Sequence, residues 1–347
     1  MYNLKNDYSN GCHPSILKRL IDTNDTSQEG YGVDEYSKEA KQLLMAKVGN
    51  PKAKVFFASG GTQANLLVIA ALLKSHEAVI SVKTGHISCH EAGAIESIGH
   101  KIITVDSEDG KLKPSSIEEA LKRHDLSPHV VKPKMIYISN ATELGTFYTR
   151  KELRQLSQFC KVHELFVFMD GARLGNALRA KGNDLSMNDI STWTDVFSIG
   201  GTKNGGLLGE AIIFNQAGLA VDFDILLKQK GALLSKSRVF GVQFLELFKD
   251  DLYFSLAEKA NHMAIKLAKA LQNEIGCPFL MEPTTNQIFP ILPNEWVRIL
   301  EQNQRFHVWK TLDDQYSAVR MMTSWNTQDG EIDLLIKELK EYNNDNE

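Results

Sequence analysis

The sequence reads FVFMDGAR at residues 166–173 and IGGTKNGG at residues 199–206, and both segments are apolar runs that end abruptly at polar and small residues. Each run is typical of a buried parallel strand. Asp170 closes the first run, and Lys203 follows the second. Ligands of open α/β sheets bind at the carboxyl ends of the strands. We therefore expect the Asp170 carboxylate and the Lys203 amine to face one cavity.

Short apolar strands alternate with helical patterns through the first two thirds of the chain. The expected strands lie at 54–58, 78–82, 101–105, 135–139, 166–170 and 210–214, and one more strand precedes Lys203. Repeated β-α units of this kind predict an α/β fold, with a mostly parallel sheet sandwiched by helices.

The alternation ends after residue 215, and the remaining sequence predicts a small C-terminal α+β domain with one long helix at 252–275. We expect three parts: an N-terminal arm (1–30), a large domain (31–240) and a small domain (241–347). The arm is polar and contains glycine, so it is expected to lie outside the core.

The composition is typical of a globular protein, and the distribution of charge favours a small polar substrate over a nucleic acid or a membrane. The 347 residues carry a formal net charge of -4, with acidic and basic residues spread along the chain. This leaves no basic face for nucleic acid or for a membrane surface. The N-terminus lacks the apolar core of a signal peptide, and no apolar run approaches the roughly 20 residues of a membrane span. We expect a cytoplasmic protein that binds neither nucleic acid nor membrane.

A glycine turn, Gly60-Gly61-Thr62, connects the strand at 54–58 to a helix rich in Ala and Leu. Glycines let the backbone approach a ligand closely, and the free N–H groups of a helix start favour an anion. The turn is therefore a candidate phosphate site, although such turns also occur merely for tight packing.

His86 and His90, with Glu91 adjacent, raise the alternative of a metal site. Their order differs from H-E-x-x-H, and no third ligand is evident, so we expect no metal. The four cysteines lack C-x-x-C spacing and are expected to be free thiols. His86 follows a strand and is expected over the cavity of Asp170 and Lys203, whereas His90 better fits a capping or surface role.

These residues together match the groups of one cofactor. A lysine at a strand end can form a Schiff base with an aldehyde once its amine is neutral. A buried aspartate needs a partner such as a pyridinium nitrogen. The glycine turn fits a phosphate, and the His86 imidazole can stack on an aromatic ring. Aldehyde, pyridine nitrogen, phosphate and ring describe pyridoxal phosphate.

The sequence resembles the fold-type-I pyridoxal-phosphate enzymes, and among them the threonine aldolase and β-eliminating lyase group, over nearly the whole chain. The order and spacing of six motifs carry the resemblance: Asp170-Gly171-Ala172-Arg173, Gly201-Thr202-Lys203, Gly61-Thr62-Gln63-Ala64-Asn65, Gly85-His86-Ile87, Tyr31-Gly32 and Val319-Arg320. The resemblance implies that Lys203 binds the cofactor aldehyde, that Asp170 pairs with the pyridine nitrogen and that His86 stacks on the ring.

The resemblance also implies the remaining contacts of the cofactor and the substrate. Gly60, Gly61 and Thr62 would bind the phosphate. Arg173 and Arg320 would hold the substrate carboxylate or brace the cofactor, because a planar guanidinium binds a carboxylate bidentately.

The substrate half of the site departs from the family. Threonine aldolases typically carry Ser-Asp-Thr where this chain has Asn6-Asp7-Tyr8, so Asn6 is expected to replace the serine at the substrate carboxylate. They usually carry a histidine following Asn-Thr, where this chain reads Asn140-Ala141-Thr142, so Thr142 is expected to recognise the substrate hydroxyl.

Other contacts are implied at a subunit interface. The family commonly forms dimers or tetramers, and we expect a homo-oligomer, most simply a tetramer with two-fold symmetry. Tyr31 of the arm is expected to reach the substrate there. In the family, an arginine of the neighbouring subunit normally contacts the phosphate. Lys230, Lys236 and Arg238 are the three candidates for this role in this chain.

The resemblance implies retro-aldol cleavage of L-threonine or L-allo-threonine to glycine and an aldehyde. His86 is the first candidate for the base on the β-hydroxyl, directly or through water, and Lys203 or a water would reprotonate Cα. The alternatives are a β-eliminating lyase or aminotransferase acting on another amino acid. A non-catalytic nucleotide-phosphate module is a further alternative, but the chain lacks its G-K-[ST] ending.

Overall fold

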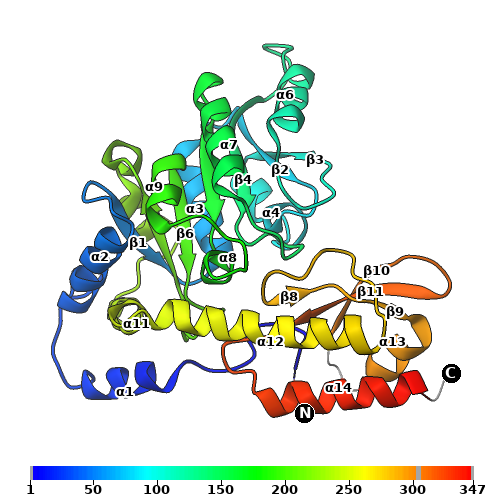
Figure 1. Cartoon of the computed structure of the whole chain (residues 1–347). Coiled ribbons are helices and arrows are strands. Elements are labelled where there is room, and N and C mark those ends of the chain that lie inside the picture. The colour runs from blue at the N-terminus through cyan, green and yellow to red at the C-terminus, as the bar shows by residue number, and fades with distance from the viewer. Residues whose placement is uncertain (1–2, 302–305, 345–347) are drawn as a thin grey trace.

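A computed structural model describes residues 3–301 and 306–344 of the chain. Within these residues, a seven-stranded sheet with helices on both faces adjoins a smaller four-stranded sheet (Figure 1). None of the described helices combines the length and the apolar character that a membrane span requires.

The large sheet consists of β1 (Lys54–Ala58), β2 (Glu77–Val82), β3 (Lys101–Val105), β4 (Lys132–Ser139), β5 (Phe166–Asp170), β6 (Val196–Gly200) and β7 (Glu210–Phe214). Their spatial order is β1-β7-β6-β5-β4-β2-β3, and β7 alone runs antiparallel to its neighbours. The predicted mostly parallel sheet is therefore confirmed. β5 and β6 are adjacent and parallel, so their carboxyl ends meet at one edge.

The helices around this sheet are α1 (Pro14–Asp22), α2 (Glu35–Lys47), α3 (Gly61–Leu72), α4 (His86–Cys89), α5 (Ala94–Ser97), α6 (Pro114–Arg123), α7 (Arg150–Val162), α8 (Leu174–Leu178), α9 (Met187–Trp193), α10 (Phe223–Gln229) and α11 (Arg238–Lys249), with a short 3-10 turn η1 (Ala217–Ala220). They cover both faces because successive strand side chains point to opposite sides. Phe168 packs in the core beneath α3 and α10, whereas Val167 and Met169 pack in the core beneath α7 and α9.

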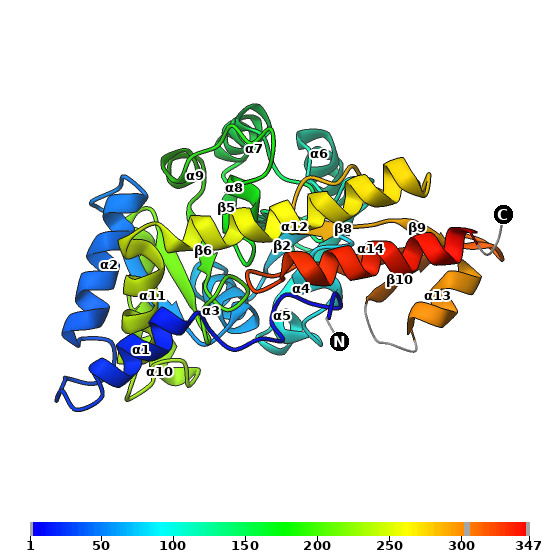
Figure 2. The same cartoon turned by 60° about the horizontal axis from the view of Figure 1, so that its bottom comes forward.

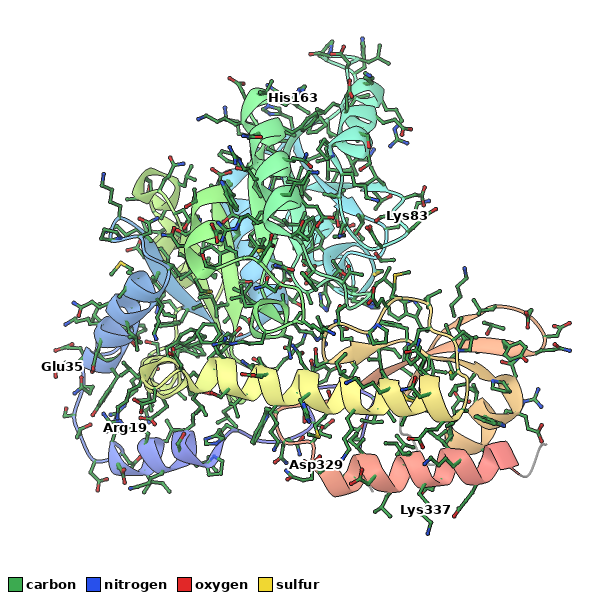
Figure 3. The ribbon with its side chains drawn as sticks, viewed as in Figure 1. Arg19, Glu35, Lys83, His163, Asp329 and Lys337 are labelled. Carbon is green, nitrogen blue, oxygen red and sulfur yellow. The ribbon has the colours of Figure 1, made fainter. Side chains whose placement is uncertain are left out.

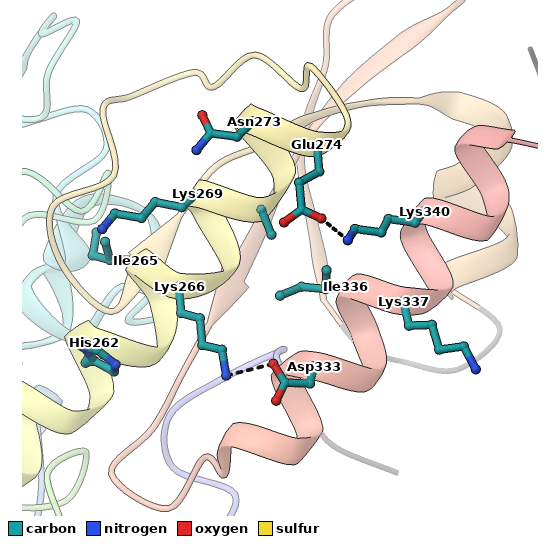
Figure 4. A pocket seen from close by; sticks show the side chains of 11 residues that line it. His262, Ile265, Lys266, Lys269, Asn273, Glu274, Asp333, Ile336, Lys337 and Lys340 are labelled. Atoms are coloured by element: carbon teal, nitrogen blue, oxygen red, sulfur yellow. Dashed lines mark ion pairs between the residues drawn. The ribbon is translucent and has the colours of Figure 1, made fainter.

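The smaller part consists of α12 (Leu252–Glu274), β8 (Gln287–Ile288), β9 (Ile291–Pro293), α13 (Asn294–Glu301), β10 (His307–Thr311), β11 (Tyr316–Met322) and α14 (Asp329–Asn344). β11 pairs antiparallel with β8, β9 and β10. α12 and α14 lie side by side in both views (Figures 1 and 2). Ion pairs from Lys266 to Asp333 and from Lys340 to Glu274 join them along a groove (Figure 4).

Charged side chains of both signs project from the outer elements. Figure 3 labels Arg19 on α1, Glu35 on α2, and Asp329 and Lys337 on α14. This arrangement agrees with the even spread of charge along the sequence.

The N-terminal arm is part of the core, contrary to expectation. Leu4 is 1% exposed and packs with the apolar side chains of α12, β11 and α14. Its carbonyl oxygen accepts a hydrogen bond from the Met322 N–H at 2.8 Å. The domain boundary at residue 240 stays a prediction, since α11 and the beginning of α12 pack with the large core and the rest of α12 with the small one.

Phe168→Ala is expected to lower the free energy of unfolding by about 3–5 kcal/mol, because the side chain is fully buried in the centre of β5 and its loss leaves a cavity. Urea denaturation followed by circular dichroism measures the change. The matched control is Val162→Ala at the exposed end of α7, which should change stability by less than about 0.5 kcal/mol. Equal effects of the two substitutions would contradict the assignment of the core.

Candidate active site

Two glycines bring the ends of β5 and β6 into close contact. A Cβ atom at Gly171 would overlap the Ser198 carbonyl oxygen, and one at Gly200 would lie 2.5 Å from the Ala172 carbonyl oxygen. Only glycine fits at both positions, so the residues around Asp170 and Lys203 are held next to each other. Both side chains line one cavity of about 280 Å³.

The cavity brings together seven of the predicted site residues: Gly60, Gly61, Thr62, His86, Asp170, Arg173 and Lys203. Its wall also contains residues that the sequence analysis did not single out, among them Tyr8, Glu143 and Glu210. The segments that form it come from the N-terminal arm, from β4, β5 and β7, and from the loops that follow β1, β2 and β6.

Asp170 is buried and accepts three hydrogen bonds. The Tyr137 hydroxyl donates to Oδ2 at 2.6 Å, the Asn65 amide donates to Oδ2 at 3.1 Å, and the Ala172 N–H donates to Oδ1 at 2.8 Å. Burial works against the ionised form, but His86, the Tyr137 hydroxyl and Lys203 together hold the pKa of Asp170 below its ordinary value. The site therefore contains a permanent negative charge.

Lys203 lies three residues beyond β6 in the turn that precedes β7. Burial lowers the pKa of its amine, and the positive charge of Arg173 lowers it further. A lowered pKa increases the neutral fraction of the amine, which is the form that reacts with a carbonyl group.

His86 is oriented by a buried carboxylate. Its Nδ1 lies 2.7 Å from Oε1 of Glu91, whose side chain is fully buried. Because a carboxylate only accepts hydrogen bonds, Nδ1 carries a proton in this contact, and in the neutral form of the ring Nε2 is then the acceptor. Asn65 donates to the same Glu91 oxygen at 2.7 Å as well as to Asp170. The Asn65 amide thus connects the Asp170 carboxylate to Glu91, the residue that holds the His86 imidazole.

The glycine turn forms the start of α3. Gly60 is the N-cap residue, and no side chain caps the helix. A Cβ atom at Gly60 or Gly61 would meet no other atom within 4 Å, so the space in front of the turn is open. An uncapped helix start beside open space is suited to an anion such as phosphate.

A buried ion pair adjoins the cavity, whose wall contains its Arg173 side chain. Asp7 of the arm accepts hydrogen bonds from Arg173 Nε at 2.7 Å and Nη2 at 3.0 Å, and from the Asn286 amide at 3.0 Å. Arg320 lies near this pair with its guanidinium 5.4 Å from the Trp309 ring centre. Its Nε is buried and has no hydrogen-bond partner among the described residues. An unpaired cation at this position can accept a carboxylate ligand.

Two expected substrate contacts from the arm lie elsewhere in this chain. The Asn6 side chain accepts hydrogen bonds from the Tyr8 N–H and the Ser9 hydroxyl, so it stabilises a local turn, and the next two residues reach the site instead. Tyr31 is 49% exposed, and the Lys228 ammonium lies over its ring at 4.3 Å. Neither residue belongs to the cavity wall.

The expected hydroxyl-recognition residue, Thr142, points into its own loop. It is fully buried, and its hydroxyl group pairs with the Thr146 hydroxyl at 2.8 Å and accepts from the N–H groups of Leu144 and Thr146. The next residue, Glu143, lines the cavity. Thr142 therefore does not face the cavity as expected, because the loop turns its side chain inward.

The three basic residues expected at the phosphate lie in different places in the structure. Arg238 donates hydrogen bonds to the carbonyl oxygens of Thr23 and Thr26, which fixes it against the arm of its own chain. Lys236 is exposed and outside the cavity wall. Lys230 lines a neighbouring hollow of about 570 Å³ that also contains the glycine turn. Of the three, Lys230 alone lies beside the turn within this chain.

The residues that the sequence analysis missed carried weak local signals. Glu91 follows His86 by five positions but was considered only as a metal ligand. Asn65 stands within the quoted motif after the glycine turn, and Asp7 stands within the quoted segment Asn6-Asp7-Tyr8, in which only Asn6 has an expected role. Among the described residues, no group of three or more His, Cys, Asp or Glu could hold a metal ion, and all four cysteines are unpaired.

The fold and the cavity define an α/β enzyme with a reactive lysine and an ionised aspartate at the ends of adjacent strands. A family model described as beta-eliminating lyase matches residues 14–295. The chain is 34% identical over 338 residues to a low specificity L-threonine aldolase of Pseudomonas aeruginosa, a match that covers 96% of this chain and 95% of that protein.

Solved structures agree with this assignment. A threonine aldolase of Leishmania major has a TM-score of 0.96 and 42% identity, with 99% of this chain and 100% of that chain covered. Mouse CSAD, at 16% identity and a TM-score of 0.76 over 97% of this chain and 83% of that one, shares the fold alone. The chain belongs to the β-eliminating lyase family, whose members are fold-type-I enzymes that depend on pyridoxal phosphate.

The residues of the cavity fit pyridoxal phosphate. Asp170 is an ionised, buried carboxylate suited to a protonated pyridine nitrogen, and Lys203 is an amine with a lowered pKa suited to an aldehyde. The uncapped start of α3 is suited to the phosphate. The donor set therefore contains a partner for each of the three polar groups of the cofactor.

Glu210→Gln is expected to change the pH dependence of stability of the cofactor-free protein. Burial and the nearby Asp170 raise the pKa of the Glu210 carboxyl to about 8, from an ordinary value of 4.5. The folded state therefore binds this proton more tightly than the unfolded state does. The stability that results is complete below pH 4.5 and is lost as the pH rises through 8.

Relative to the Glu210→Gln variant, the free energy of unfolding of the wild type should fall by up to about 1.4 kcal/mol per pH unit across this window. Urea denaturation of both proteins at several pH values measures the difference. A wild-type free energy of unfolding that stays constant or rises with pH, relative to that of the variant, would show that Glu210 is ionised in the folded protein.

Proposed function

We propose that this protein cleaves a β-hydroxy-α-amino acid, L-threonine or L-allo-threonine, to glycine and acetaldehyde with the help of pyridoxal phosphate. The proposal rests on one observation: Lys203 and Asp170 line the same cavity as the uncapped start of α3. The relatives named threonine aldolase support the choice of reaction. Bound pyridoxal phosphate supplies an electron-accepting ring for the pair released when the Cα–Cβ bond breaks.

Lys203, Asp170 and His86 are the residues proposed to hold the cofactor. Lys203 holds the aldehyde carbon, and its lowered pKa provides the neutral amine that this attachment needs. Asp170 holds the pyridine nitrogen in its protonated form, because its own ionised state is stabilised by three hydrogen bonds. The His86 ring stacks on the cofactor ring.

The phosphate is proposed to bind at Gly60, Gly61 and Thr62, where the backbone N–H groups at the start of α3 have no capping side chain. Lys230 supplies a positive charge on the outer side of the same turn.

Arg173 and Arg320 are proposed to bind the substrate carboxylate. Arg173 already uses Nε and Nη2 on Asp7, so Nη1 is the nitrogen that it can offer to a ligand. Arg320 has a buried Nε without a partner among the described residues, so a carboxylate would satisfy it. Together, the two guanidinium groups fix the orientation of the amino acid above the cofactor site.

His86 is also the proposed base. With Nδ1 held by Glu91, its Nε2 accepts the proton of the β-hydroxyl group, directly or through a water molecule. Lys203 would return a proton to Cα from the same cavity. Both transfers use groups that line the same cavity.

A β-eliminating lyase or an aminotransferase is the second candidate, because the family description itself names β-elimination. The same cofactor contacts serve these reactions, and the bond that breaks is the one held perpendicular to the ring. We further propose that the protein is a cytoplasmic homo-oligomer, a dimer or a tetramer, in which the exposed Tyr31 contacts a second copy.

The purified protein loaded with pyridoxal phosphate is expected to convert L-threonine to equal amounts of glycine and acetaldehyde, and Lys203→Ala is expected to abolish the conversion. Chromatographic analysis of the products measures both. Ammonia and 2-oxobutanoate as products would contradict aldol cleavage and favour elimination. Lys181→Ala, at an exposed position between α8 and α9, is the control and should leave the products unchanged.

Arg320→Gln is expected to raise the KM for L-threonine about tenfold or more, because a lost charge-assisted hydrogen bond to the carboxylate costs about 1.5–3 kcal/mol. Steady-state kinetics give KM and kcat separately. Arg298→Gln on the exposed face of α13 is the matched control and should leave KM unchanged. An unaltered KM in the Arg320 variant would remove this residue from the carboxylate site.

A further inference from the structure

The cavity wall contains a second carboxyl group, that of Glu143, to which the proposed reaction assigns no role. Glu143 follows β4 in the loop in which Thr142 turns inward, and its side chain lines the cavity together with His86 and Arg173. The residue is 6% exposed. Such a group needs a partner, and the cavity is where a ligand can provide one.

The hydrogen bonds of Glu143 distinguish its two oxygens. The Ser139 hydroxyl donates to Oε1 at 2.7 Å, and the His86 backbone N–H donates to Oε1 at 3.0 Å. Both bonds that the side chain accepts from other residues thus end on one oxygen. The other oxygen, Oε2, accepts no hydrogen bond from another described residue, so in the protonated acid Oε2 is the oxygen that can donate to a ligand in the cavity.

The surroundings raise the pKa of the Glu143 carboxyl group. Burial raises the pKa of Glu143, and the negative charge of Asp170 also raises it, against the effect of the Ser139 hydrogen bond and of His86. The His86 Nδ1 faces Glu91, so the neutral His86 ring offers Nε2 as an acceptor. A donor from Glu143 and an acceptor on His86 therefore line the same cavity.

We propose that Glu143, as a neutral carboxylic acid, donates a hydrogen bond through Oε2 to the β-oxygen of the amino-acid substrate, which makes it the residue that selects a β-hydroxy amino acid. This inference rests on the proposed aldol cleavage. As His86 removes the hydroxyl proton, negative charge develops on the β-oxygen before the aldehyde C=O bond is complete. A donor at this oxygen stabilises that charge, whereas glycine, which lacks the oxygen, gains nothing from it.

Three variants of the loaded enzyme test the proposal. Glu143→Gln keeps an oxygen for Ser139 and for the His86 N–H and replaces the acid O–H by an amide N–H donor. Glu143→Met has similar length but no donor. Thr142→Val is the matched neighbour, because it removes the hydroxyl that the sequence alone suggested for this role.

Two reactions are followed for each variant: cleavage of L-threonine, and exchange of the glycine α-hydrogen with deuterium measured by NMR. Glu143→Met is expected to lower kcat/KM for threonine about 100-fold and to change glycine exchange less than about threefold. Glu143→Gln is expected to keep threonine cleavage within about tenfold of the wild type. Thr142→Val is expected to lower stability but to leave the ratio of the two activities unchanged.

Equal losses of threonine cleavage in Glu143→Gln and Glu143→Met would overturn the proposal, since the residue would then act as a carboxylate. Retained cleavage in Glu143→Met would also overturn it. If Glu143→Met does not fold, Glu143→Gln decides alone, with retained cleavage supporting the neutral acid and its loss contradicting it. A wild type that exchanges glycine but cleaves no threonine would refute the proposed function and this inference together.

Discussion

The site depends on keeping the carboxylate of Asp170 ionised inside the protein. Burial alone would favour the protonated form, but His86, the Tyr137 hydroxyl and Lys203 hold the pKa of Asp170 below its ordinary value. Tyr137 on β4, Asn65 on α3 and the backbone N–H of Ala172 donate hydrogen bonds to the carboxylate. Because Asn65 also donates to Glu91, the same contact helps to fix the His86 imidazole. The charge of one residue therefore determines the arrangement of a strand, a helix and a loop.

A second constraint joins the two parts of the molecule. Asp7 of the N-terminal arm is bound by Arg173, which follows β5, and by Asn286, which precedes β8 of the small sheet. Three segments that are far apart in the sequence thus meet at one buried carboxylate. Breaking such a pair leaves an uncompensated buried charge, so the arm, the large sheet and the small sheet hold one another in place. The guanidinium that completes this contact also lines the cavity.

The sequence predicts the strands, whose apolar pattern repeats, but not the direction of side chains in loops, which depends on the conformation of each loop. β1, β3 and β7 lie at the predicted residues because short apolar runs between turns specify buried strands. β10 was missed because HVWKT is a partly exposed edge strand without an apolar run. Thr142 and Asn6 are predicted to contact the substrate, but each points into its own turn, whereas the neighbouring Glu143 and Tyr8 line the cavity. Side-chain direction in a loop follows from backbone geometry that no periodic pattern records.

The central claim is that Lys203 and Asp170 hold opposite ends of one pyridoxal phosphate molecule. The most direct measurement is to reduce the protein with borohydride after incubation with pyridoxal phosphate and to find the modified peptide by mass spectrometry. The account predicts that the reduced cofactor is attached to Lys203 and that the visible absorption band disappears on reduction. Attachment at Lys230 or another lysine, or no attachment at all, would contradict it.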